Sequence, residues 1–98
     1  MHLQEPERGE MGILSRVFQS TDLVDGMARR LGADLSADIA EHPDTAATRL
    51  RSLVIRCTAC REREECRTLQ SRCNHLRTAP AYCMNRDELA RLAHAPAR

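Results

Sequence analysis

Five cysteines lie in the second half of this 98-residue chain, and their spacing could build a metal centre. Two residues separate Cys57 from Cys60, and five more precede Cys66. Two thiolates three positions apart can face one centre, and a third can reach it from one to two helical turns further along. Free cysteines often serve as small apolar core residues, but three of these five lie in a charged segment. We therefore expect Cys57, Cys60 and Cys66 to bind a metal centre.

The fourth ligand has three candidates. If a helix continued beyond Cys66, Cys73 would lie about two turns, or roughly 10 Å, further along, which is far for a shared centre. Cys83 directly precedes an expected helix N-terminus, where the chain can fold back and the helix dipole favours a thiolate. We expect Cys83 to complete the set, with Cys73 or His75 as the alternatives.

The spacing also bears on the metal. In a tetrahedral zinc site with Zn–S bonds near 2.3 Å, the sulfur atoms lie only ~3.8 Å apart. A cubane iron–sulfur cluster spreads its thiolates further, and four cysteines are its usual complement. Structural zinc sites commonly pair two C-x-x-C knuckles, and here there is one. We expect a [4Fe–4S] cluster, with zinc as the alternative.

Helical periodicity extends through the N-terminal half, which must support these ligands. We expect a flexible lead over residues 1–9 and a single helical metal-binding domain over residues 10–95. Apolar residues recur at helical spacing over 11–18, and Thr21 could cap a second stretch that ends at Gly32. The apolar stripe along both stretches is interpreted as core: Leu14, Val17, Phe18, Leu23, Val24, Met27 and Leu31.

Local sequence signals predict the bounds of the remaining helices. A short helix over about 36–41 should end at His42-Pro43, because the residue before proline avoids the α region. Asp44 or Thr45 could cap a longer helix that leads to Cys57, and residues 59–69 read as a helix carrying Cys60 and Cys66. A loop follows over 73–84, and Asn85 with Glu88 resembles a capping box before a last helix. The predicted class is all-α, a small bundle of four to five short helices with the metal site in its C-terminal half.

Composition restricts the function. The chain has no Trp, one Phe and one Tyr, so aromatic packing is scarce and a bound metal would add stability. All 15 basic residues are Arg, and eight of them lie in the segment 49–77, opposed there by three Glu. That segment could bind nucleic acid, which is a further alternative, although the formal net charge is only +1 and stacking aromatics are missing from it.

Several function classes are not expected. No segment has the ~20 apolar residues that span a bilayer, and the polar start is unlike a secretory signal, so we expect a cytoplasmic protein. No catalytic motif accompanies the cysteines, so we expect no enzyme. The leading prediction is a small iron–sulfur protein for redox sensing, regulation or electron transfer. A zinc-stabilised interaction module is the second prediction. A protein partner is expected in either case, either a redox partner or a second copy bound through the N-terminal apolar helices.

Two resemblances rest on these residues. The spacing from Cys57 to Cys66 is similar to that of the [4Fe–4S] ligands in WhiB-like regulators and endonuclease-III-type DNA glycosylases, where the fourth Cys lies upstream. The chain also resembles the bacterial family called domain of unknown function 6455 over about residues 11–93. The resemblance is carried by the stretches 27–32 and 56–60, by Cys66, and by Cys83-Met84-Asn85, in which Met84 replaces the family's proline. It implies that Cys83 rather than Cys73 is the fourth ligand.

Overall fold

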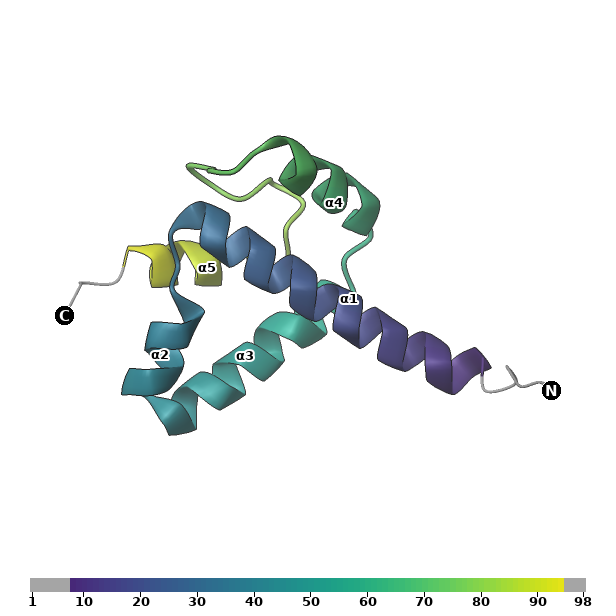
Figure 1. Ribbon diagram of the computed structural model, residues 1–98, viewed down its shortest axis with the longest axis horizontal. Coiled ribbons are helices and arrows are strands. Elements are labelled where there is room, and N and C mark those ends of the chain that lie inside the picture. Colours follow the sequence, from purple (N-terminus) through teal and green to yellow (C-terminus); the bar gives the residue numbers. More distant parts are fainter. Residues whose placement is uncertain (1–7, 95–98) are drawn as a thin grey trace.

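The computed structural model of the protein describes residues 8–94, with side chains from residue 12 onward. Every regular element in that range is a helix: α1 (Arg8–Leu31), α2 (Leu35–Glu41), α3 (Pro43–Thr58), α4 (Arg63–Arg72) and α5 (Arg86–Ala93) (Figure 1). The predicted all-α class and the number of helices are therefore confirmed for this part of the chain.

The longest helix, α1, is continuous where two helical stretches were expected. Thr21 lies inside it, and its hydroxyl donates a 2.8 Å hydrogen bond to the Val17 carbonyl instead of capping a new helix. Such back-bonding lets a threonine stay within a helix. The helix ends as predicted at Gly32, whose φ of +85° favours glycine. It begins at Arg8, so residues 8 and 9 of the expected lead are helical, and residues 1–7 lie outside the described range.

Two helix starts differ from the expectation. His42-Pro43 ends α2 as predicted, but Pro43 is also the first residue of α3, so neither Asp44 nor Thr45 is the cap. Proline suits this position because its fixed φ is helical and a first-turn N–H has no helical partner. Helix α4 begins at Arg63 rather than at residue 59, which leaves Cys60 in the turn before it.

The start of α5 lies at the predicted residue but uses a different interaction. Asn85 is the N-cap residue, yet its side chain makes no cap hydrogen bond. It is buried, and its Nδ2 donates a 2.7 Å bond to the Leu53 carbonyl of α3. The expected capping box with Glu88 is therefore wrong, because the tie between α5 and α3 takes the Asn85 amide.

The core lies where the second half of α1 meets α3, α4 and α5, while α2 packs on α3. Its buried residues come from all of these except α2, together with the α1–α2 connection and the loop before α5: Leu23, Val24, Met27, Ala28, Ala33, Leu53, Cys66, Ala79 and Leu89. The stripe was expected to be core along its whole length, and for Leu14, Val17 and Phe18 this is wrong, because all three are exposed. The first half of α1 extends beyond the other helices (Figure 1).

Arg30 fastens α1 to the end of α4. Its guanidinium donates to the Gln70 carbonyl at 2.8 Å and to the Cys73 carbonyl at 2.6 Å. Those carbonyls lie at the helix C-terminus, where helical partners are missing and a cation is favoured. The chain then turns back, and the Leu76 N–H donates to the Arg30 carbonyl at 2.9 Å. This reversal allows the segment before α5 to return toward α3.

Candidate metal centre

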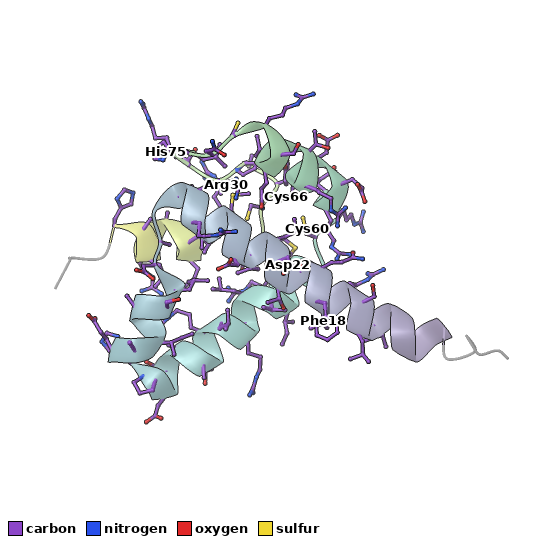
Figure 2. All side chains as sticks on the ribbon, viewed as in Figure 1. Phe18, Asp22, Arg30, Cys60, Cys66 and His75 are labelled. Atoms are coloured by element: carbon purple, nitrogen blue, oxygen red, sulfur yellow. The ribbon has the colours of Figure 1, made fainter. Side chains whose placement is uncertain are left out.

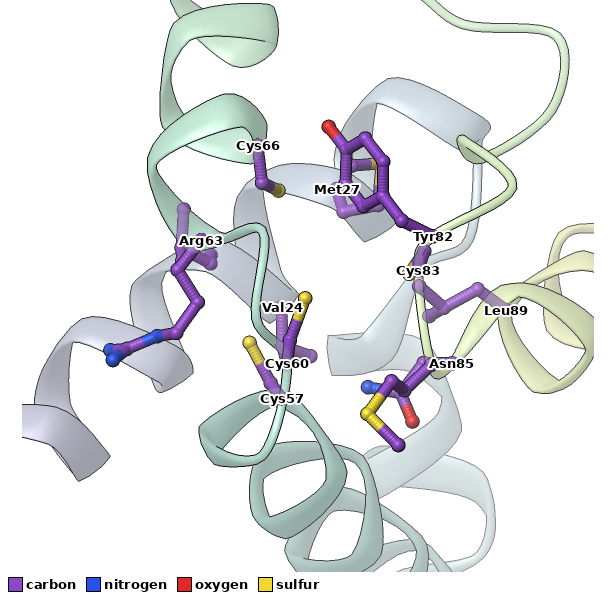
Figure 3. Close-up of a pocket in the computed structure, with 12 residues that line it drawn as sticks. Val24, Met27, Cys57, Cys60, Arg63, Cys66, Tyr82, Cys83, Asn85 and Leu89 are labelled. Carbon is purple, nitrogen blue, oxygen red and sulfur yellow. The ribbon is translucent and has the colours of Figure 1, made fainter.

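Four cysteines line one pocket, and they come from the end of α3 with its following turn, from α4 and from the segment before α5 (Figure 3). Cys57 lies in the last turn of α3, Cys60 in the turn that follows, Cys66 on α4 and Cys83 just before α5. These are the four residues predicted as ligands, and Cys57 lies at the end of the helix that was expected to lead to it. All five cysteines of the chain are free thiols.

The rest of the pocket wall is largely apolar. It includes Leu23, Val24 and Met27 from α1, with Tyr82 beside Cys83 and Leu89 from α5. The cavity volume is about 20 Å³, roughly the room that one water molecule needs. Leu23, Val24 and Met27 are thus core and pocket wall at once, so the thiols face a largely apolar wall.

The two alternative ligands lie elsewhere. Neither Cys73 nor His75 lines the pocket. Cys73 caps the far end of α4, where its carbonyl is held by Arg30. His75 is exposed on the following loop and lies well apart from Cys60 and Cys66 (Figure 2). The geometry therefore groups Cys83, and neither of the alternatives, with the other three thiols.

Two of the four sulfur atoms accept hydrogen bonds. The Glu62 backbone N–H donates to Cys60 Sγ at 3.4 Å. The Gln70 side-chain amide donates to Cys66 Sγ at 3.4 Å and to the Leu23 carbonyl at 3.0 Å, which fixes its orientation. Donors directed at sulfur stabilise a thiolate and tune a bound metal.

A donor also lies beside each of the other two sulfur atoms. The Ser20 hydroxyl is fully buried and has no hydrogen-bond partner of good geometry. Burial raises the pKa of the neighbouring Cys57 thiol, and the Ser20 hydroxyl partly opposes that rise. The backbone N–H of Asn85 acts in the same way on Cys83. A buried hydroxyl without a partner is costly, and a negatively charged sulfur at Cys57 would supply one.

Burial dominates the acidity of the pocket thiols. It raises the pKa of Cys57, Cys66 and Cys83 above the ordinary value of 9.0, and the negative charges of neighbouring cysteines raise it further. These thiols are therefore protonated at neutral pH in the metal-free protein and are poor nucleophiles. A cationic centre would reverse this, because it offsets both the desolvation and the mutual repulsion of the thiolates.

The thiols surround a space but do not converge on one point. Within residues 8–94, no group of three or more His, Cys, Asp or Glu side chains is close enough to hold a single metal ion. Cys60 and Cys83 both lie on non-helical segments. Backbone adjustment there could change the separation of the sulfur atoms without unwinding a helix.

Sequence reasoning missed three residues that contact or flank the thiols: Ser20, Gln70 and Tyr82. Ser20 directly precedes Thr21, the expected cap of the second helical stretch. Gln70 lies in a segment rich in charged residues, where a polar side chain is not distinctive. The helical spacing of Gln70 from Cys66, four residues on, was the available signal, since such pairs share a helix face. Nothing local could have indicated Ser20, which approaches Cys57 only through packing of α1 on α3.

The Arg-rich segment is partly occupied by intramolecular contacts. Arg49 pairs with Asp38 at 2.9 Å, and Arg67 pairs with Glu64 at 2.6 Å. Arg63 donates to the Arg16 carbonyl at 3.3 Å and to Gln19 at 3.2 Å, linking α4 to α1. Nucleic-acid binding by residues 49–77 stays a prediction, and these arginines are already engaged within the fold.

Comparison with known proteins gives a family and no activity. The model of a family of unknown function, DUF6455, matches residues 11–95. No curated protein and no solved structure matches the chain. No helix within residues 8–94 has the length and apolar character needed to cross a membrane.

Proposed function

The chain belongs to this family of unknown function, and from its cysteine pocket we propose that it is a small iron–sulfur protein. Cys57, Cys60, Cys66 and Cys83 hold a [4Fe–4S] cluster, which serves redox sensing or one-electron transfer. The observation that carries the proposal is that these four thiols, and no other cysteine, line a single pocket. Four thiolates are the usual ligand complement of such a cluster.

The surroundings of the sulfur atoms support this role. Each sulfur has one donor beside it, and two of these are hydrogen bonds of 3.4 Å. Hydrogen bonds to sulfur and an apolar wall set the potential of an iron–sulfur centre. Loading the pocket must release protons, because three of its thiols are protonated at neutral pH in the metal-free protein.

The positions of the ligands favour a cluster over a single zinc ion. The four thiols come from three segments and surround a space also bounded by Met27 and Tyr82. A cubane core joins thiolates spread in this way, whereas zinc requires them to meet around one atom. The present cavity is narrow, so a bound cluster would require the turn carrying Cys60 and the segment carrying Cys83 to lie further apart.

The test is purification without oxygen, followed by iron and sulfide analysis and a visible spectrum. We expect about four irons per chain and a brown protein. Serine substitution of Cys57, Cys60, Cys66 or Cys83 should abolish or severely reduce the iron content. The matched control is Cys73→Ser, which removes a cysteine from outside the pocket and should leave the spectrum unchanged.

Three outcomes would contradict the proposal in different ways. A colourless, iron-free protein that holds one zinc ion and tolerates air would replace the cluster with a zinc-stabilised interaction module. Loss of iron in Cys73→Ser with retention in Cys83→Ser would reject Cys83 as the fourth ligand and leave the cluster itself in place. DNA binding with a steep salt dependence, unaffected by cysteine substitution, would favour the Arg-rich segment as the functional surface.

A further inference from the structure

The first half of α1 carries exposed apolar side chains that do not belong to the described core. Ile13 is 65% exposed, Leu14 49%, Val17 36% and Phe18 66%. We call these four residues the Ile13–Phe18 stripe. They recur at positions i, i+1, i+4 and i+5, which lie on one side of a helix. This part of α1 projects past the other helices, with Phe18 on its surface (Figures 1 and 2).

Other faces of the same segment are polar or engaged with the body of the protein. Arg63 of α4 donates to the Arg16 carbonyl and to Gln19, and Gln19 in turn donates to Ser15 at 3.2 Å. The stripe therefore forms a separate apolar face of several hundred Å² on a helix whose position is fixed. Contiguous exposed patches of this size mark interaction sites.

The stripe is complementary to itself. Its residue numbers pair symmetrically about a point between residues 15 and 16. A two-fold axis through that point would place Ile13 against the partner copy's position 18 and Leu14 against position 17. Such an arrangement is the isologous contact of a symmetric dimer, in which every contact between two different positions occurs twice.

We propose that a second copy of this chain docks antiparallel along the Ile13–Phe18 stripe. The large aromatic Phe18 anchors each end of the contact against the smaller Ile13. Two such stripes together bury roughly 1,000 Å², which is near the lower limit for a specific interface. The dimer is therefore reversible and depends on protein concentration. This proposal does not depend on which metal the pocket holds.

Sedimentation of the full chain over a concentration series, with the pocket in one defined metal state, is the first test. We expect a monomer–dimer equilibrium, and Phe18→Glu should raise its dissociation constant by at least about tenfold. The matched control is Arg16→Glu, a charged substitution on the same helical turn but off the stripe, which should leave the equilibrium within about threefold. Circular dichroism establishes that each variant retains its helices.

A charge swap tests the antiparallel register. Ile13→Lys should weaken the dimer as Phe18→Glu does, whereas the double variant should recover it, because each new cation meets a new anion of the partner. The recovery should weaken with salt. A chain that stays monomeric at several hundred micromolar would overturn the proposal. So would a dimer that is insensitive to Phe18→Glu, or a double variant that fails to recover.

Discussion

The two halves of α1 have similar apolar periodicity and different environments. In the second half, Val24 and Met27 are each 2% exposed and form both core and pocket wall. In the first half, Ile13 and Phe18 are about two-thirds exposed. The difference arises because the buried side chains described in α1 all lie in its second half, which faces the core, whereas Arg63 of α4 reaches the first half through polar contacts. An amphipathic pattern therefore specifies a face of a helix but not what covers it.

Truncation of an apolar side chain should change the free energy of unfolding much more in the second half of α1 than in the first, and this is the largest difference that we expect. We expect Met27→Ala to lower the free energy of unfolding by about 2–5 kcal/mol, because a buried side chain leaves a cavity. Ile13→Ala should change it by less than about 0.5 kcal/mol. Urea unfolding of the metal-free protein, at a concentration where it is monomeric, measures both. Comparable losses for the two variants would mean that the halves are equally packed.

Alkaline pH should lower the stability of the protein through the thiols of the pocket that the second half of α1 lines. Burial raises the pKa of Cys57, Cys66 and Cys83 in the folded state, so the folded protein keeps protons that the unfolded chain releases. Stability is then fully present below the ordinary thiol pKa of 9.0 and falls as pH rises beyond it.

Urea midpoints of metal-free protein between about pH 7 and pH 10.5 test this titration. Burial also raises the pKa of Tyr82, which contributes at the upper end of that range. Replacing Cys57, Cys66 and Cys83 with Ser should flatten the profile. A profile that is flat in the unmodified chain would show that these thiols are not buried in solution.

Two glycines in the same helix offer a matched pair. A Cβ on Gly12 would meet nothing within 4 Å, so Gly12→Ala should stabilise the protein by up to about 1 kcal/mol through helix propensity. A Cβ on Gly26 would lie 2.0 Å from Gln70 Oε1, so the Gln70 side chain must move. It would lose its bonds to the Leu23 carbonyl and to Cys66 Sγ, which offsets the gain in propensity.

Thermal unfolding of both glycine variants gives the comparison, with Tm rising for Gly12→Ala and not for Gly26→Ala. If the pocket holds the proposed cluster, Gly26→Ala should also shift the reduction potential of that cluster, because a donor to Cys66 is displaced. Equal stabilisation by both substitutions would indicate that Gln70 does not occupy its place beside Gly26.

The smallest effect is expected at the joint between α2 and α3, which is remote from the stripe and the pocket. The Arg49 guanidinium, which donates to Asp38 at 2.9 Å and 3.0 Å, lowers the pKa of that carboxyl from 3.8. The stabilisation from this ion pair is fully present above pH 3.8 and is lost as the pH falls through the lowered pKa of Asp38. This pH dependence is opposite in direction to that of the thiols. Arg49→Met should cost about 0.5 kcal/mol at pH 7, and this cost should shrink as the pH falls below 3.8. A double-mutant cycle with Asp38→Asn checks the pair.

Short-range signals in the sequence predicted the helical class, several helix boundaries and the grouping of three of the pocket cysteines. Gly32 ends α1 because its φ is positive, and Pro43 separates α2 from α3 because proline restricts the residue before it. The spacing of Cys57, Cys60 and Cys66 groups them through local geometry alone. In each case the physics operates within about one or two helical turns, so adjacent residues carry enough information.

Tertiary structure decided the rest. Cys83 reaches the other thiols because Arg30 holds the end of α4 and the chain reverses at Leu76. Ser20 lies beside Cys57 because α1 packs on α3. Packing also decided which half of the apolar stripe is covered. These relations join residues tens of positions apart, and they depend on how helices with similar apolar faces compete for one another, which no local pattern encodes.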